Sequence, residues 1–268
     1  MKVVIFCGGM GLRLREHEEQ LPKPMIPIGY RPMLWHVMRW YAHFGHTEFI
    51  LCLGYKADAI KEYFLSYNEA LTNDFVLEKG GREVTLLRSD IDNWRISFVD
   101  TGLTANVGQR LKAVERFVGD DEVFLANYAD VLTDAHLPSM IDEFYRRDAI
   151  AQMMTVQPNY TFHLVDADAN GLVKHMKDVK EADLWINGGH FVFRREVFDF
   201  IEEGEELVRE PFYRIMAQGR LSAYRHDGFW VPLDTIKEKQ ALDDMYDRGV
   251  RPWCVWEDEP LAALDETP

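Results

Sequence analysis

The feature that most constrains the fold is a glycine-rich segment that directly follows an uninterrupted apolar run. Residues 3–7 (Val-Val-Ile-Phe-Cys) are all apolar, and a run without alternation is typical of a strand buried on both faces of a parallel sheet. Gly8, Gly9 and Gly11 come next. Glycines let a backbone approach a ligand closely and point its amides at an anion. We therefore predict an anion-binding loop at the carboxyl end of the first strand.

Two widespread phosphate-binding loops do not fit this segment. A Walker A loop requires Gly-Lys-Ser/Thr, which is absent, and Leu14 stands where a dinucleotide-binding motif has its third glycine. Arg13 adds a cation to the segment. The pattern favours an anion-binding loop of another kind, and a plain tight turn is the alternative.

The rest of the first 150 residues alternates between strand and helix patterns. Strands are predicted at residues 49–53, 96–99 and 123–126, and helices at residues 33–44, 57–65 and 110–117. Such alternation predicts βαβ units and a mostly parallel sheet. Later segments follow a mixed pattern, with short strands near 151–156, 172–175 and 190–193, a turn at 168–171, and helices near 210–217 and 235–248. We therefore predict an α/β fold with a smaller β-containing second part.

The charge of the chain argues against nucleic acid as a partner. The formal net charge is −15, whereas duplex binding depends on Lys and Arg that neutralise phosphates. Cys7, Cys52 and Cys254 form no disulfide framework or metal motif, so we expect reduced, buried thiols. Because no apolar stretch is long enough for a signal peptide or a spanning helix, we expect a cytoplasmic protein without membrane partners.

A lysine between two prolines follows the glycine-rich segment. Pro22 and Pro24 restrict the backbone on both sides, so that Lys23 is presented rigidly. A fixed ammonium group close to an anion-binding loop suits a polyphosphate whose charge must be neutralised. A surface turn is the alternative, but the position after the glycines favours the phosphate role.

Two aspartates that lie far apart in the chain are candidate ligands of a magnesium ion. Asp130 follows the fourth predicted strand, at the edge where ligands of open α/β sheets bind. Asp234 lies at the entrance to the last predicted helix. Mg²⁺ takes one or two carboxylates in addition to water and substrate phosphates, so the pair fits this ion. The alternative for Asp234 is that it caps the helix.

A polar segment before a later predicted strand is a candidate site for hydroxyl groups. Asn187 offers an amide side chain and Gly188 a bare backbone, and a simple hairpin turn is the alternative. The aromatic residues of the helix at 33–44 are expected in the core, whereas His36 and His43 are expected on the surface of that helix.

Together these motifs resemble those of a known family, the sugar-1-phosphate nucleotidyltransferases. The family signature G-G-x-G-x-R-L followed by P-K-P-M is matched by residues 8–14 and 22–25. Segments similar to the glucose-1-phosphate cytidylyltransferase branch are residues 99–102, 108–112, 228–235 and 252–257. The resemblance implies a Rossmann-like nucleotidyltransferase fold, with a mostly parallel central sheet flanked by helices.

The resemblance also implies how the chain is divided. A single domain would cover residues 1–257, with the nucleotide bound by about residues 1–150 and the acceptor sugar by about residues 151–257. Residues 258–268 would form a flexible tail. The reaction would join a nucleoside triphosphate to a sugar-1-phosphate, giving a nucleotide sugar and pyrophosphate with Mg²⁺ as the cofactor.

By the same resemblance, each candidate residue has a role. Catalysis would depend on Lys23, Arg13, Asp130 and Asp234, of which the two aspartates would bind Mg²⁺. The nucleotide would be held by Gly8, Gly9, Met10, Gly11, Leu12, Arg13, Lys23, Arg110 and Ala129. The acceptor sugar would contact Lys177, Asp178, Asn187 and Gly188.

The chain departs from the family pattern mainly at the acceptor end. Lys177-Asp178 stands where the family commonly has Glu-Lys, and Ala129 precedes Asp130 where the family has glycine. The first exchange adds a cation at the sugar and removes one at its phosphate, so we expect glucose-1-phosphate to be a poor acceptor. The alternatives are a one-residue register shift that puts Asp178 in the role of the Glu, so that glucose-1-phosphate still binds, and a strand that lies outside the pocket.

CTP is the expected nucleotide donor by resemblance. The alternatives are transfer from dTTP or UTP by the same class of enzyme, and a non-catalytic subunit that binds a nucleotide sugar. The presence of Lys23, Asp130 and Asp234 favours an active enzyme. A homo-oligomer is left open.

Overall fold

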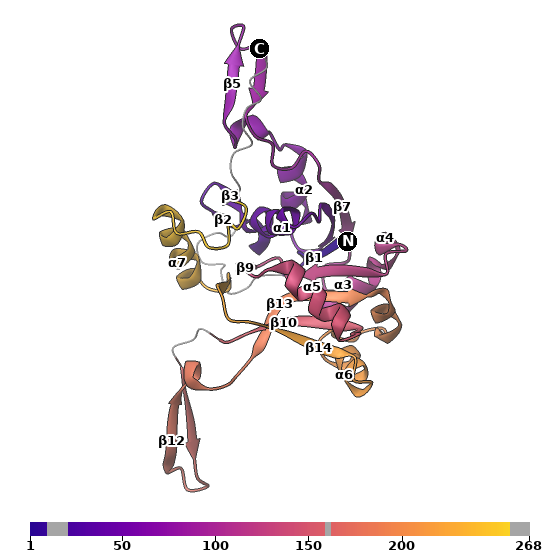
Figure 1. Cartoon of the computed structure of the whole chain (residues 1–268), viewed down its shortest axis with the longest axis vertical. Coiled ribbons are helices and arrows are strands. Elements are labelled where there is room, and N and C mark those ends of the chain that lie inside the picture. The colour runs from indigo at the N-terminus through magenta and orange to yellow at the C-terminus, as the bar shows by residue number, and fades with distance from the viewer. Residues whose placement is uncertain (10–20, 159–161, 258–268) are drawn as a thin grey trace.

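The computed structural model describes residues 1–9, 21–158 and 162–257. Its centre is a sheet of seven strands (Figure 1). In spatial order the strands are β14 (Leu221–His226), β10 (Ala151–Val156), β13 (Ile186–Arg194), β8 (Val123–Asn127), β1 (Val3–Phe6), β4 (Glu48–Leu53) and β7 (Arg95–Asp100). The prediction for the tail at 258–268 falls outside the described residues.

The sheet is mostly parallel, which confirms the predicted fold class. β8, β1, β4 and β7 run parallel to one another, and β14 runs parallel to β10. β13 is antiparallel to both of its neighbours, β10 and β8. Strands from before and after residue 150 therefore share one sheet, and the carboxyl ends of the four parallel strands meet at one edge.

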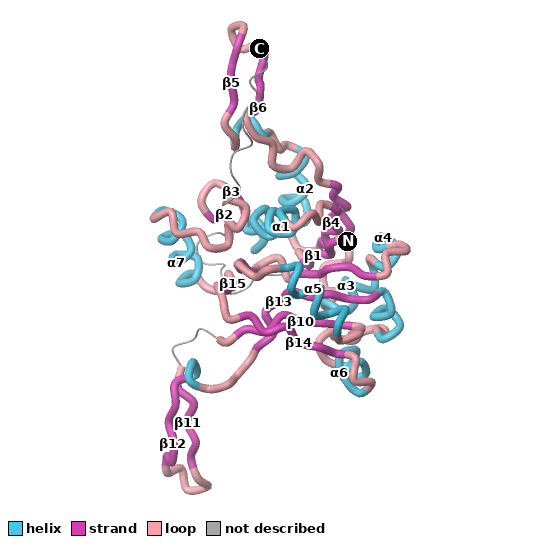
Figure 2. Tube along the Cα trace, in the orientation of Figure 1, coloured by secondary structure: helices cyan, strands magenta, loops and turns pink. Residues whose placement is uncertain are grey.

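Helices cover both faces of this sheet (Figure 2). The α-helices are α1 (Met33–His43), α2 (Ala57–Leu65), α3 (Val107–Ala113), α4 (Glu115–Val118), α5 (Leu137–Arg146), α6 (Glu210–Ala217) and α7 (Ile236–Asp247). Buried residues of α1 and α5 belong to the core on one face, and those of α3, α4 and α6 to the core on the other. The helix predicted at 110–117 is divided into α3 and α4, and α5 has no counterpart among the predicted helices. No helix in the described ranges is long and apolar enough to cross a membrane.

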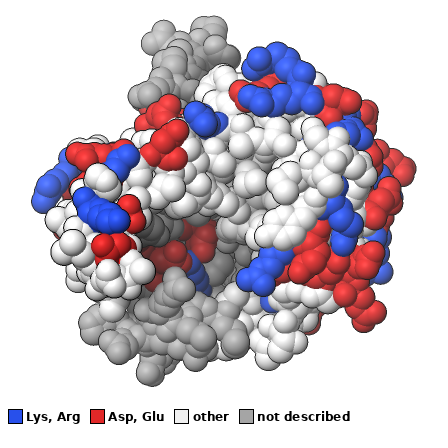
Figure 3. Space-filling model, turned by 90° about the horizontal axis from the view of Figure 1, so that it is seen from below, with Lys and Arg blue, Asp and Glu red and all other residues white. Residues whose placement is uncertain are grey.

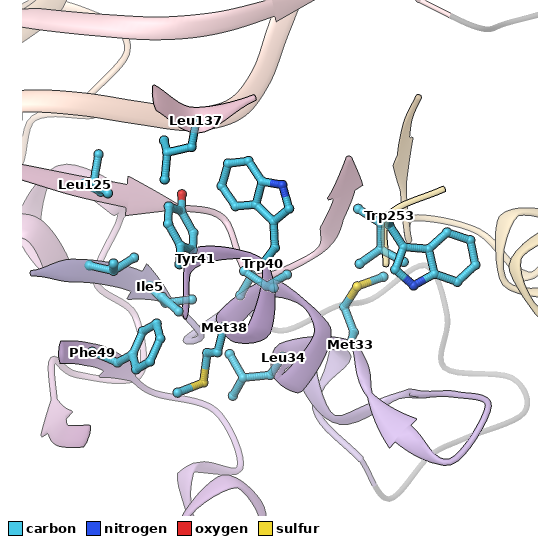
Figure 4. Close-up of a cluster of buried hydrophobic side chains, with 14 of the residues drawn as sticks. Ile5, Met33, Leu34, Met38, Trp40, Tyr41, Phe49, Leu125, Leu137 and Trp253 are labelled. Atoms are coloured by element: carbon cyan, nitrogen blue, oxygen red, sulfur yellow. The ribbon is translucent and has the colours of Figure 1, made fainter. Parts of the chain in front are cut away.

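The two-sided burial explains the uninterrupted apolar run of the first strand. Ile5 packs into the core beneath α1, whereas Val4 and Phe6 pack into the core on the other face. Leu34 and Tyr41 of α1 lie in the first of these cores (Figure 4). Every residue of β1 is thus buried, and no position on it can be polar without desolvating a polar group.

His36 corrects the sequence prediction for α1. Instead of lying on the surface, it is 3% exposed, and its Nε2 atom donates to the Ile28 carbonyl at 3.0 Å. Trp253 and Trp256 from the end of the chain pack against the imidazole. The C-terminal segment therefore covers a helix face that local periodicity assigns to solvent. The three cysteines are free and buried, as predicted.

Two hairpins project from opposite ends of the molecule (Figures 1 and 2). One consists of β5 (Phe75–Glu78) and β6 (Glu83–Leu86), and the other of β11 (His163–Ala167) and β12 (Val173–Asp178). Most of their side chains are exposed. The turn predicted at 168–171 connects β11 to β12, whereas the first hairpin has no predicted counterpart.

Short elements complete the chain and position the candidate site. Two small ladders pair β2 (Pro27–Ile28) with β3 (Arg31–Pro32) and β9 (Val131–Thr133) with β15 (Trp230–Pro232). The 3₁₀-helices are η2 (Lys23–Met25), η3 (Glu69–Leu71), η4 (Val179–Glu181) and η5 (Arg195–Phe200). The β9–β15 ladder matters most, because it joins the segments that carry the two candidate aspartates.

Candidate active site

Lys23 lies between the two aspartates that the sequence singled out. Its Nζ atom is 2.5 Å from Oδ2 of Asp130 and 2.5 Å from Oδ1 of Asp234. The two carboxylate oxygens are therefore no farther apart than twice that distance. Lys23 begins η2, in which the Met25 amide donates to the Pro22 carbonyl at 2.8 Å. The two prolines thus form a tight turn that fixes the lysine, and its side chain is only 14% exposed.

Asp130 is directed into the site by an unusual backbone conformation. The preceding residue, Ala129, has φ +66°, in the left-handed region that favours glycine. Its amide donates to Oδ1 of Asn127 at 2.7 Å, which stabilises the turn after β8. Beyond it, the Leu233 amide donates to the Asp130 carbonyl at 2.8 Å. The turn and the β9–β15 ladder together bring Asp130 and Asp234 to the same place.

The helix after Asp234 has its own cap. The Thr235 hydroxyl accepts from the Glu238 amide at 3.2 Å, and the Glu238 carboxylate accepts from the Thr235 amide at 2.8 Å. The same carboxylate accepts from the Asp234 amide at 2.8 Å. Because this reciprocal pair caps α7, the N-cap is Thr235 and not Asp234, and the Asp234 carboxylate faces Lys23 instead.

Two carboxylates surround the single positive charge of Lys23. Burial alone would lower the pKa of Lys23, but the Asp130 and Asp234 carboxylates outweigh this effect and raise the pKa. The ammonium group therefore stays charged at neutral pH. Burial raises the pKa of the Asp130 carboxyl, and the Lys23 ammonium acts against that rise.

The two carboxylates suit a hard divalent cation. Their oxygens converge on one cation already, the Lys23 ammonium. Within the described ranges, no group of three His, Cys, Asp or Glu side chains gathers to hold a metal ion. Two carboxylates with the remaining ligands from water and substrate phosphates are what Mg²⁺ takes, whereas Zn²⁺ requires three or four protein ligands. The residues therefore fit magnesium.

The carboxyl edge of the sheet places the first glycines against Arg110. The Arg110 guanidinium donates to the carbonyls of Gly8 at 3.0 Å and Leu53 at 3.1 Å, and to the Thr101 hydroxyl at 2.7 Å. Only 4% of Arg110 is exposed. The buried guanidinium group connects the ends of three neighbouring strands beneath the start of the glycine-rich segment. Met10, Gly11, Leu12 and Arg13 lie outside the described residues.

Asn187 and Gly188 lie within β13 rather than before a strand. Nδ2 of Asn187 donates to the Tyr128 hydroxyl at 3.2 Å, and Nε1 of Trp230 donates to the Gly188 carbonyl at 2.9 Å. Asn187 pairs with β10, and Gly188 lies at the register shift of the same ladder, so the hairpin-turn alternative does not apply. Tyr128 stands two residues before Asp130, so this polar cluster adjoins the aspartate site along the chain.

Lys177 and Asp178 lie on the projecting hairpin, away from the central sheet (Figure 1). Lys177 pairs with Leu164 and is exposed, and Asp178 pairs with His163 and is half-buried. The described structure therefore brings together Lys23, Asp130 and Asp234, but it does not bring the hairpin residues to them.

Tyr128 and Trp230 are neighbours of the site that sequence reasoning did not assign. Trp230 also lines an open pocket of about 570 Å³ with Val156, Phe229 and Met245. Seen from below, the surface is hollowed, and side chains of both charges are visible inside the hollow (Figure 3). The sequence feature that could have identified Tyr128 is its position in the polar segment that ends the fourth predicted strand, at residues 123–126.

Comparisons with known proteins identify the family and the fold. A family model described as "Nucleotidyl transferase" matches residues 2–258. The chain is 36% identical over 258 residues to the glucose-1-phosphate cytidylyltransferase of Salmonella typhi, covering 96% of this chain and 100% of that protein. The protein of the same name from Salmonella typhimurium gives the same identity and coverage. Among solved structures, a UDP-glucose pyrophosphorylase complexed with UDP-glucose has a TM-score of 0.69 at 17% identity, covering 92% of this chain and 98% of that one. That last likeness concerns the fold alone.

Proposed function

Because the chain belongs to the nucleotidyl transferase family, we propose that it transfers a cytidylyl group from CTP to a sugar-1-phosphate and releases pyrophosphate. The observation that carries the proposal is the convergence of Asp130, Asp234 and Lys23 at the carboxyl edge of a parallel sheet. The choice of CTP is supported by full-length identity to proteins named glucose-1-phosphate cytidylyltransferase.

The reaction is an in-line displacement at the α-phosphorus of the nucleotide. An oxygen of the sugar phosphate forms a bond to that phosphorus, the bond to the bridging oxygen of the β-phosphate breaks, and its electron pair leaves with pyrophosphate. Lys23 neutralises negative charge on the transferred phosphate, because its ammonium is fixed, nearly buried and charged. No covalent enzyme intermediate is required.

Asp130 and Asp234 would both bind the same Mg²⁺ ion. When bound, the ion supplies charge neutralisation and alignment of the triphosphate. Asp130 is held by the turn at Ala129, and Asp234 by the capped start of α7. Both carboxylates are thus presented by rigid backbone, which keeps the phosphate chain in line with the acceptor.

The decisive experiment is a pyrophosphate-release screen of the four ribonucleotides and dTTP against a panel of sugar-1-phosphates, with and without Mg²⁺. CTP should give the highest kcat/KM. A higher value with dTTP or UTP would assign the same chemistry to another base, and no release with any pair would reject catalysis in favour of a binding subunit.

The acceptor panel should include glucose-1-phosphate and glucuronate-1-phosphate. The sequence predicts that the charge exchange at Lys177 and Asp178 disfavours glucose-1-phosphate, whereas the structure places both residues on the hairpin away from Asp130 and Asp234. A tenfold preference for glucose-1-phosphate, about 1.4 kcal/mol in transition-state binding, would contradict that prediction. A cytoplasmic location stays a prediction, and a homo-oligomer is left open. Light scattering on the purified protein tests the oligomer.

A further inference from the structure

Tyr128 is held in one orientation through its ring and its backbone amide. Its ring packs against Phe6 and Phe191, with centroids 6.2 Å and 5.2 Å away. Its amide donates to the Gly189 carbonyl at 3.1 Å. Gly189 has φ +78°, and a Cβ atom there would lie 2.9 Å from Cδ2 of Tyr128. Glycine at this position therefore makes room for the tyrosine ring.

The hydroxyl of Tyr128 determines how the Asn187 amide is oriented. Oδ1 of Asn187 must be the atom that faces the Gly189 amide, at 2.9 Å, because only an oxygen can accept that bond. Nδ2 therefore faces Tyr128, and the tyrosine oxygen accepts from it at 3.2 Å. One Nδ2 hydrogen of Asn187 and the hydroxyl hydrogen of Tyr128 remain for other partners.

We propose that Tyr128 is a positioning residue of the acceptor site, which holds the Asn187 amide so that its remaining Nδ2 hydrogen can be donated to an oxygen of the sugar. The inference rests on the proposed function. It extends that function by adding a residue to the acceptor end, where Lys177 and Asp178 depart from the family pattern. Asn187 and Tyr128 are both half-buried, so the pair is open to a ligand on one side.

Tyr128 also connects the proposed acceptor site to the aspartates that would bind the metal ion. Asp130 follows it by two residues, and the same turn fixes both. A sugar that hydrogen-bonds to the Tyr128–Asn187 pair is thereby placed relative to the aspartates by the rigid end of β8. Holding the attacking group in this way is worth more to the rate than an equally strong contact on a mobile loop.

The test is Tyr128→Phe, which removes the hydroxyl and keeps the ring between Phe6 and Phe191. Tyr41→Phe is the matched control, because the Tyr41 hydroxyl donates to the Ala126 carbonyl of the same strand at 3.3 Å but lies in the core. KM for the best acceptor of the screen should rise about 3- to 10-fold in Tyr128→Phe, the effect of losing one hydrogen bond. KM for CTP should change less than twofold, and Tyr41→Phe should change neither value.

A double-variant cycle with Asn187→Ala separates positioning from packing. Tyr128→Phe should add nothing in the Asn187→Ala background, since the hydroxyl acts through the amide. Calorimetry should show weaker binding of the CDP-sugar product to Tyr128→Phe, with CDP binding unchanged.

Additive effects of the two variants, or equal losses for CDP and the CDP-sugar, would overturn the inference while the proposed function stands. The absence of turnover in the unmodified protein would instead remove the proposed function, and the inference with it.

Discussion

Replacing Lys23 with methionine removes the ammonium between Asp130 and Asp234 but keeps an unbranched side chain of similar length. Two carboxylates that both lie 2.5 Å from the lysine nitrogen would then face each other without a counter-charge. The variant should be less stable in the absence of Mg²⁺, and its turnover should fall by a factor of about 10²–10³, as for the loss of one charge-stabilising group.

The size of the stability loss follows from the separation of the carboxylates. Two unit charges about 5 Å apart repel each other by about 3 kcal/mol at an effective dielectric constant of about 20. Because 37% of the Asp234 side chain is exposed, solvent screens part of this, and we expect about 2 kcal/mol. For a chain of this length that corresponds to a fall in Tm of about 4 °C.

Thermal unfolding with and without Mg²⁺ checks the reasoning. Added Mg²⁺ should raise the Tm of Lys23→Met more than that of the unmodified protein, since the ion binds the folded form and takes the place of the lost charge. Lys239→Met is the control, because Lys239 is also largely buried, at 19% exposure, but pairs with the single carboxylate of Asp243.

Equal Mg²⁺ shifts in Lys23→Met and the unmodified protein would refute the argument, because they would mean that the two carboxylates do not share a cation site. An unchanged Tm of Lys23→Met without Mg²⁺ would refute it as well.

Three further predictions follow from single contacts. Asp130→Asn and Asp234→Asn should each abolish Mg²⁺-dependent pyrophosphate release with little loss of stability, and activity in either variant would exclude that residue as a ligand. Burial lowers the pKa of His36 and His190 to about 4, so both are neutral when folded. In the neutral form each histidine contributes about 3 kcal/mol to the free energy of unfolding. This contribution is fully present above pH 6.5 and is lost as the pH falls towards 4, which denaturant titrations at several pH values measure. Ala129→Gly should stabilise the fold by about 0.5–1 kcal/mol by relieving the left-handed φ of +66°, and a lower unfolding midpoint would contradict this.

The sequence predicts the carboxyl edge of the parallel strands well because local patterns determine it. The four parallel strands coincide with the four predicted strands, and the residues after them must lie at one edge of the sheet. This rule places Asp130 at the edge where the glycine-rich segment begins. It does not predict the contact with Lys23, which lies beyond that segment in η2, or the contact with Asp234, which depends on pairing between β9 and β15, 3 residues long each.

The parts that the sequence does not predict depend on long-range packing. His36 is buried because Trp253 and Trp256 cover it from the far end of the chain. The β5–β6 hairpin carries exposed apolar side chains such as Phe75 and Leu77, so its pattern has no clear inward face. Tertiary contacts decide whether a short apolar segment packs on a core or projects from it, and β-propensity does not describe those contacts.

Gly8 shows how one residue can be required for two reasons. Its place after the first strand suggests that it is small so that a ligand can approach. A Cβ atom at Gly8 would, however, lie 2.0 Å from Nη1 of Arg110, and one at Gly54 would lie 2.9 Å from the same atom. Both glycines leave space for a guanidinium that bonds to the strand ends from beneath. An alanine at Gly8 would therefore displace Arg110 before it met any nucleotide, so that weaker nucleotide binding in such a variant would report the loss of this support.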